Sequence, residues 1–154
     1  MPNFMRIALY QPDIPQNCGT ILRLAACFDV GVDIIEPCGF IFDDRRFKRA
    51  GMDYLNSANV QRHASWEHFR ASGDERRLVL ATTKSSCLHH EFVFQSGDTL
   101  LMGRESSGVP DIVSDYCDHK VKIAMSEHCR SLNVAVSTGI ILSEALRQTN
   151  SFPV

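Results

Sequence analysis

Short apolar runs alternate along the chain with stretches in which apolar residues recur at three- and four-residue steps. The runs predict buried strands, and the amphipathic stretches predict helices. Strands are expected at residues 6–10, 32–37, 58–63, 77–83, 98–103 and 119–125, with 58–63 at an edge of the sheet. Helices are expected at 17–31, 66–72, 110–117 and 132–149, and 43–51 is predicted to be a short basic helix or a loop. This alternation predicts an α/β fold with a mostly parallel sheet and helices on both faces.

The ends of the predicted helices carry further signals. Gly31 is expected to end the first helix, and Pro110 to open the third. The polar residues Arg130, Ser131 and Asn133 stand where the last helix should begin. One Ser or Asn is enough to cap a helix, so three polar side chains predict a loop that also holds a ligand. The buried stripe of that helix is expected to contain Val136, Ile140, Ile141, Leu142, Ala145 and Leu146.

Length and composition describe an ordinary globular chain. The 154 residues suit one domain, residues 1–154, with its own core. No basic start followed by an apolar run opens the chain, and no apolar stretch approaches the roughly 20 residues of a membrane span, which predicts a cytoplasmic protein. The six cysteines form no C-x-x-C pair, so free thiols are expected in place of disulfides. The tract 87–91, "CLHHE", is interpreted as a polar loop, and no metal site is predicted.

The net charge of −2 argues against a strongly basic nucleic-acid-binding protein, but only on average. Four cations lie within five residues of one another, namely Arg45, Arg46, Lys48 and Arg49. Such a cluster is either a solvated face or a patch that contacts phosphates.

Three unusual segments, 12–20, 103–110 and 125–133, each follow the end of a predicted strand. In open parallel sheets ligands bind beyond the carboxyl ends of the strands, so these segments are predicted to form a composite pocket. Segment 103–110 has two glycines around Glu105, but it lacks the endings of a P-loop and of a dinucleotide fingerprint. Ser131 lies in no G-x-S-x-G elbow, which argues against a serine hydrolase. Taken singly, segment 12–20 is also explained as a capped helix and segment 103–110 as a plain β–α connection.

Taken together, in this order and spacing, the segments resemble the SPOUT class of RNA methyltransferases. The class pattern is N-x-G-N-x-x-R, then G-x-E-x-x-G-[LV]-P, then I-P-M and R-S-[LM]-N before the last helix. "NCGTILR", "GRESSGVP" and "IAMSEHCRSLN" follow it here. The chain is especially similar to the small single-domain branch, the tRNA (cytidine/uridine) 2′-O-methyltransferases of the wobble nucleotide. The similarity runs from about residue 5 to residue 149.

The resemblance implies a C-terminal deep trefoil knot, S-adenosylmethionine as methyl donor, a homodimer that completes the active site, and the tRNA anticodon stem-loop as partner. The implied cofactor-binding residues are Ala81, Gly103, Ile123, Ser131 and Leu132. The implied catalytic set is Asn17, Arg23, Glu105, Ser131 and Asn133. Arg23 is expected to fix a phosphate and favour the developing alkoxide, and Asn17 to orient Arg23 or the ribose. Glu105 is expected to hold the loop or the cofactor, and the basic cluster at residues 45–49 to contact RNA.

Thr20, Ala124 and Ser143 depart from the pattern of the branch, where Asn, Pro and Tyr are usual. Three hypotheses therefore stand beside one another. The chain is a wobble 2′-O-methyltransferase, or it methylates another RNA, or it is a knotted RNA-binding protein with weak or no methyl transfer. An unrelated α/β enzyme whose loops mimic all three motifs is the least consistent with the spacing.

Overall fold

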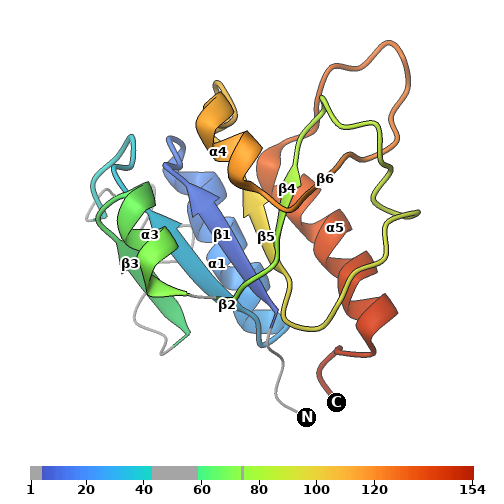
Figure 1. Cartoon of the computed structure of the whole chain (residues 1–154), viewed down its shortest axis with the longest axis horizontal. Coiled ribbons are helices and arrows are strands. Elements are labelled where there is room, and N and C mark those ends of the chain that lie inside the picture. The colour runs from blue at the N-terminus through green and yellow to red at the C-terminus, as the bar shows by residue number, and fades with distance from the viewer. Residues whose placement is uncertain (1–4, 43–58, 74) are drawn as a thin grey trace.

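A parallel sheet of six strands organises the residues that the computed structural model describes, which are 5–42, 59–73 and 75–154 (Figure 1). Its order is β3-β2-β1-β5-β4-β6, and every neighbouring pair runs parallel. The strands are β1 (Arg6–Tyr10), β2 (Gly31–Ile35), β3 (Val60–His63), β4 (Leu78–Ala81), β5 (Thr99–Met102) and β6 (His119–Val121). The prediction of a parallel sheet with 58–63 at one edge is confirmed.

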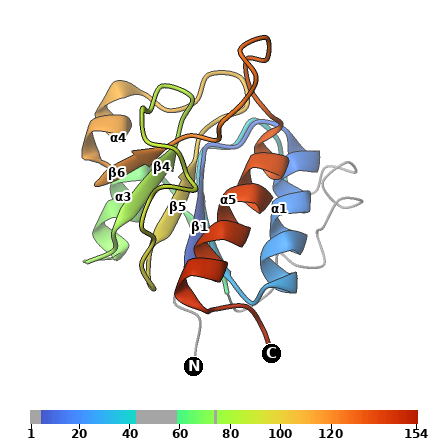
Figure 2. The ribbon, with the colours of Figure 1, turned by 90° about the vertical axis from the view of Figure 1, so that its right-hand side faces the viewer.

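Helices cover both faces of this sheet, as predicted. One face packs against α1 (Pro15–Cys27) and α5 (Val134–Thr149), and the other against α3 (Trp66–Ser72) and α4 (Asp111–Tyr116) (Figure 2). Neighbouring residues of β1 divide between the two cores, because side chains alternate across a strand: Ile7 lies in one and Ala8 in the other. Burial on both faces explains why the central strands read as nearly continuous apolar runs.

The helix boundaries differ from the predictions for local reasons. The first helix begins at Pro15 and ends at Cys27, and Asp29, with φ of 55°, turns the chain into the next strand. Gly31 is therefore the first residue of β2, and its prediction as a helix stop was wrong. Pro110 is the N-cap of α4 and not its first helical residue.

The buried stripe predicted for α5 was wrong at two positions. Ile141, Leu142, Ala145 and Leu146 are buried as expected, and they face the sheet. Val136 and Ile140 are 50% and 37% exposed. The six predicted residues are spread over a wider arc of α5 than the face that packs against the sheet and α1. Val136 and Ile140 therefore form an apolar strip that is exposed in the single chain.

The segment between β4 and β5 lies against the chain that leads from β6 into α5. Leu88 and Lys122 form an isolated parallel bridge, which is where β6 stops and the predicted strand 119–125 is cut short. Gln148 of α5 receives a hydrogen bond from the Phe94 N–H at 2.8 Å and donates one to the Phe92 carbonyl at 2.9 Å. These contacts hold the two segments together, and the trefoil knot itself stays a prediction.

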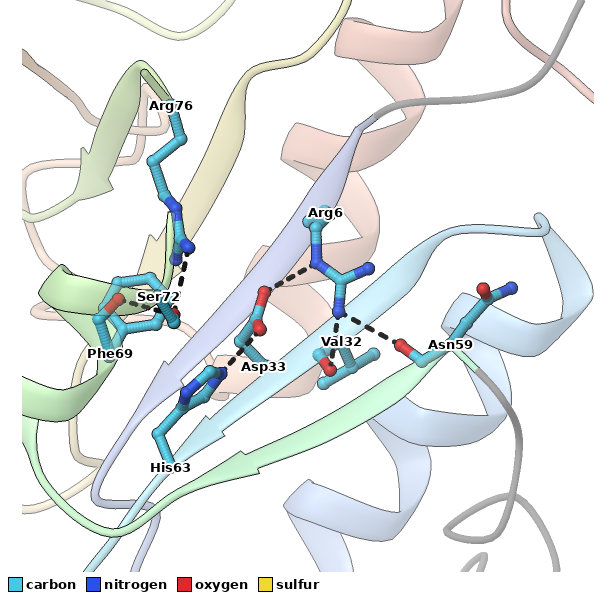
Figure 3. Close-up of polar contacts among 8 residues, drawn as sticks. All are labelled: Arg6, Val32, Asp33, Asn59, His63, Phe69, Ser72 and Arg76. Carbon is cyan, nitrogen blue, oxygen red and sulfur yellow. Dashed lines mark hydrogen bonds and ion pairs between the residues drawn. The ribbon is translucent and has the colours of Figure 1, made fainter. Parts of the chain in front are cut away.

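A buried acid joins the first three strands (Figure 3). Asp33 of β2 is 1% exposed and lies between two cationic or potentially cationic partners. Its Oδ2 accepts a bond from Arg6 Nε at 2.6 Å, and its Oδ1 lies 2.7 Å from His63 Nε2. Arg6 also donates to the backbone carbonyls of Val32 and Asn59, both at 3.1 Å. The cluster thus links β1, β2 and β3 through side chains in addition to the ladder.

Replacing Asp33 with Ala should lower the free energy of unfolding by about 3 kcal/mol, because it leaves the buried His63 and the Arg6 guanidinium without their shared acceptor. The exposed pair between Arg62 and Glu36 offers a matched control, in which Glu36→Ala should cost less than about 1 kcal/mol. Urea unfolding followed by circular dichroism measures both values. Equal losses in the two variants would contradict this account of the cluster.

Candidate functional site

The candidate site lies where the direction of winding in the sheet reverses. β1 has β2 on one side and β5 on the other, so the chain winds outward in both directions from this pair. Loops that leave the carboxyl ends of two such strands diverge and form a crevice. The loop after β1 contains Asp13, and the loop after β5 contains Glu105. The two loops are joined here by hydrogen bonds.

A cavity of about 360 Å³ opens beyond the carboxyl ends of β4, β5 and β6. This volume falls within the range of about 300–1,000 Å³ typical of small-molecule sites. Its wall mixes apolar side chains with two carboxylates, those of Glu105 and Asp111. The five residues predicted to hold the cofactor all line it, and they are Ala81, Gly103, Ile123, Ser131 and Leu132. Segments 103–110 and 125–133 therefore form a pocket as predicted, whereas segment 12–20 contributes no residue to its lining and meets the loop after β5 through hydrogen bonds from Asp13 and Asn17.

The loop after β5 closes tightly on itself. Arg104 and Gly108 exchange backbone hydrogen bonds of 3.0 Å and 2.9 Å. Gly108 has φ of 64°, a conformation that suits glycine. A Cβ added at Gly103 would lie 2.8 Å from the Cα of Gly108, so no larger residue fits without moving the loop. Backbone groups of the loop thereby approach the cavity closely, as the two glycines predicted.

A polar chain connects the start of α1, the loop after β5 and the start of α5. Asn17 donates from Nδ2 to Oε1 of Glu105 at 3.5 Å, and its Oδ1 accepts from Asn133 Nδ2 at 3.0 Å. The same Asn133 caps α5, because its Oδ1 accepts from the N–H groups of Ala135 at 2.8 Å and Val136 at 3.2 Å. Asn133 is therefore both the cap and part of the site, and Ser131 stays available at the cavity wall.

Arg23 stands apart from these residues within one chain. Its side chain is exposed on α1 and does not line the cavity. The hydrogen bonds of Asn17 go to Glu105 and Asn133, and the step of six positions from Asn17 to Arg23 turns the helix by about 240° beyond a full turn. The structure therefore brings together Asn17, Glu105, Ser131 and Asn133, and leaves Arg23 facing solvent.

Burial controls the charge state of groups near the site. Burial raises the pKa of the Glu105 carboxyl, while hydrogen bonding with Glu105 lowers the pKa of Asp13. Cys18 lies beneath the site, where burial raises its pKa far above the ordinary value, and burial raises the pKa of Cys38 to about 12. Both thiols therefore stay protonated at neutral pH and do not act as nucleophiles.

Asp13 was missed at the level of sequence, although it makes three hydrogen bonds at the site and the predicted residue Asn17 makes two. Its signal is weak: an acid between Pro12 and Ile14 at the end of a strand resembles an ordinary turn. Thr82 and Lys84, which follow β4, also line the cavity and were not singled out. Residues of this kind are recognised only once the strand order places their loops side by side.

The remaining predictions concern residues and properties outside the cavity. The basic cluster of Arg45, Arg46, Lys48 and Arg49 falls outside the described residues. Within the described ranges, no three His, Cys, Asp or Glu residues gather as metal ligands would, and the six cysteines are free thiols. None of the helices in the same ranges combines the length and the apolar character of a membrane span. Thr20 uses its hydroxyl within its own helix, donating to the Gln16 carbonyl at 2.8 Å.

Comparison with known proteins matches this chain to RNA methyltransferases over most of its length. The profile of the SpoU rRNA Methylase family matches residues 5–143. A relative from Beijerinckia indica subsp. indica, named tRNA (cytidine(34)-2'-O)-methyltransferase, is 54% identical over 147 residues, which cover 94% of this chain and 92% of the relative.

Solved structures agree with this match. One, described as "Structural insights into the 2-OH methylation of C/U34 on tRNA", has a TM-score of 0.89 and 36% identity, and the match covers 96% of this chain and 97% of that one. An AdoMet-bound rRNA methyltransferase from Sinorhizobium meliloti has a TM-score of 0.82 and 27% identity. There the match covers 96% of this chain but 57% of the other. From its fold, the loops at its cavity and these matches over nearly its whole length, the chain belongs to the SpoU rRNA Methylase family.

Proposed function

We propose that this chain, acting as one domain of residues 1–154, transfers a methyl group from S-adenosylmethionine to the ribose 2′-hydroxyl of nucleotide 34 of tRNA. That nucleotide is the cytidine or uridine at the wobble position of the anticodon. The observation that carries the proposal is the match over 94% of this chain to a relative named for this reaction, at 54% identity, together with the solved structure described for C/U34 of tRNA.

The cavity fits the methyl donor. Backbone groups near Gly103 and Gly108 can approach a ligand closely, and apolar side chains such as Ile123 and Leu132 suit the faces of an adenine ring. The carboxylate of Glu105 suits hydroxyl or ammonium groups. S-adenosylmethionine supplies an electrophilic methyl group on its sulfonium. The protein then needs chiefly to position the ribose and to exclude water.

Arg23 is the residue proposed to bind the RNA phosphate, and its exposed position on α1 leaves it free to do so in a dimer. A guanidinium stays protonated at neutral pH, so its role is to bind a phosphate beside the reactive ribose and to stabilise negative charge that develops on the 2′ oxygen. Arg23 does not line the cavity of its own chain. A homodimer that brings Arg23 of one subunit to the cavity of the other would satisfy both observations.

An apolar strip offers the surface for such a dimer. Leu132, Val136 and Ile140 follow one another at four-residue steps, and they are 40%, 50% and 37% exposed. Val136 and Ile140, four residues apart on α5, lie on one side of the helix, and Leu132 belongs to the segment just before it. These exposed apolar side chains, of which Leu132 also lies at the cavity wall, favour a second copy of this chain as their cover.

The function is tested by transfer of a labelled methyl group from S-adenosylmethionine to tRNA that lacks ribose methylation, with the product nucleoside mapped by mass spectrometry. A 2′-O-methyl group at nucleotide 34 is the expected product. Arg23→Ala should lower the rate by about 100-fold or more while S-adenosylmethionine still binds within about threefold of the native affinity. Binding without transfer by the native chain would favour the RNA-binding alternative, and methylation at another nucleotide would overturn the assigned position.

Gly103→Ala should weaken binding of S-adenosylmethionine by about tenfold or more. Its Cβ would overlap the backbone of Gly108 and push open the loop after β5, a change that costs on the order of 1–3 kcal/mol. Gly139→Ala is the matched control, because a Cβ there meets Leu24 only at an ordinary 3.8 Å. Isothermal titration calorimetry measures both affinities, and unchanged binding by Gly103→Ala would place the cofactor elsewhere.

Ile140→Glu should convert a dimer into a monomer, because the new carboxylate would have to be buried without a partner. Ile112→Glu on α4 serves as control, since Ile112 is 71% exposed on the opposite face of the sheet. Light scattering after size-exclusion chromatography should give twice 17.3 kDa for the native chain and the control, and 17.3 kDa for Ile140→Glu. A native chain that elutes as a monomer contradicts the proposed dimer.

A further inference from the structure

Asp13 stands one residue before the N-cap of α1, yet its carboxylate does not serve that helix. The N-cap residue is Ile14, whose side chain makes no capping hydrogen bond to the first N–H groups of α1. An acid at the start of a helix is well placed for that role, both as a cap and against the helix dipole. The carboxylate of Asp13 is instead directed to the loop after β5, 92 residues further along the chain.

The hydrogen bonds between Asp13 and this loop are reciprocal. The N–H of Glu105 donates to Asp13 Oδ1 at 3.2 Å, and the hydroxyl of Ser106 donates to Oδ2 at 2.5 Å. The N–H of Asp13 in turn donates to Oε2 of Glu105 at 3.0 Å. Asp13 therefore holds Glu105 at both its backbone and its carboxylate.

Asp13 has little room to move away from this position. A Cβ added at Gly39 would lie 2.7 Å from the Cβ and 2.9 Å from the Cα of Asp13, so the segment after β2 packs directly on its other side. The N–H of Gly39 donates to the carbonyl of Pro12 at 3.0 Å, which fixes that contact. Asp13 is thus held between the segment after β2 and the loop after β5.

Placing two carboxyl groups together is unfavourable, because like charges repel and burial disfavours the charged form. Burial raises the pKa of Glu105, and the pKa of Asp13 is lowered by hydrogen bonding with Glu105. A plain structural tie between two loops does not require a pair of acids. Because this pairing of two acids is unfavourable, we infer that the carboxylate of Glu105 has a role at the cavity. The N–H of Asp13 and the amide of Asn17 hold it in place.

We propose that Asp13 is a positioning residue that acts through Glu105 and Ser106 to hold the loop Gly103–Gly108 in the shape that closes the cavity. Asp13 does not line the cavity itself, whereas Glu105 and Ser106 both do. The assignment deepens the proposed function, since it concerns the loop that is expected to hold S-adenosylmethionine. Asp13 belongs to neither set of site residues predicted from the sequence.

The test compares Asp13→Ala, Asp13→Asn, Glu105→Gln and the double variant Asp13→Ala/Glu105→Gln in the full chain. The affinity for S-adenosylhomocysteine is measured by calorimetry, and transfer to unmethylated tRNA is measured as kcat and KM. Asp115→Ala is the matched control, because Asp115 is an exposed acid of α4 that makes no side-chain hydrogen bond or ion pair within the described part of the chain. The unfolding temperature of each variant is recorded as well.

Asp13→Ala should weaken S-adenosylhomocysteine binding by about tenfold and lower kcat, with the KM for tRNA nearly unchanged. Asp13→Asn should recover most of the affinity, because its amide oxygen still accepts from the Glu105 N–H and the Ser106 hydroxyl can turn to accept from its amide. In the Glu105→Gln background, Asp13→Ala should add less than about a twofold loss, since residues that act through one another are not additive.

Two results would overturn the assignment. One is full additivity of Asp13→Ala and Glu105→Gln, which would mean that Asp13 acts independently of Glu105. The other is a lower unfolding temperature with unchanged affinity and kcat in the folded protein, which would make Asp13 a purely structural tie. If the native chain methylates no tRNA, the proposed function fails, but the affinities for S-adenosylhomocysteine still decide the role of Asp13.

Discussion

The parallel pairing of β1 with β5 is the constraint on which the rest of the site depends. Its register sets Leu9 opposite Met102, so the two strands end side by side although they lie about 90 residues apart in the chain. Asp13 and Glu105 then leave the sheet at the same edge and can exchange hydrogen bonds. A shift of one residue in this register would turn Ile7 and Leu9 toward the other face and separate the two loops.

The helices serve the site through their first turns. Asn133 satisfies two free N–H groups of α5 and, with the rest of its amide, binds Asn17 of α1. Asn17 in turn reaches Glu105. The polar chain thereby ties the starts of two helices to the loop after β5, so that the cavity wall is held by groups that also stabilise the helices. Asn17 and Glu105 are half-buried and Asn133 is exposed in the single chain, so these hydrogen bonds orient the side chains at the site and do not compensate fully buried polar groups.

Sequence reasoning succeeded where the signal is local and strong. The helix at 66–72 and the order of strands and helices were predicted correctly, because apolar periodicity and caps such as Ser65 determine them within a few residues. It failed at Gly31, where a positive φ at Asp29 ended the turn earlier, and at Val136 and Ile140, whose burial depends on what covers the helix. The three motifs led to the family because their spacing is specific, and the comparisons confirmed that resemblance.

By itself the sequence predicted the fold class and the three loops at the carboxyl ends of strands, and through the family resemblance it pointed to five residues that line the cavity. The fold class follows from local periodicity, whereas the five residues follow from the resemblance of the three motifs to the SPOUT class. Only the tertiary structure decided that Asp13 pairs with Glu105, that Asn133 is both cap and site residue, and that Arg23 lies away from the cavity of its own chain. Each of these depends on contacts between residues far apart in the chain, and strand order and register, which local patterns do not encode, bring such residues together.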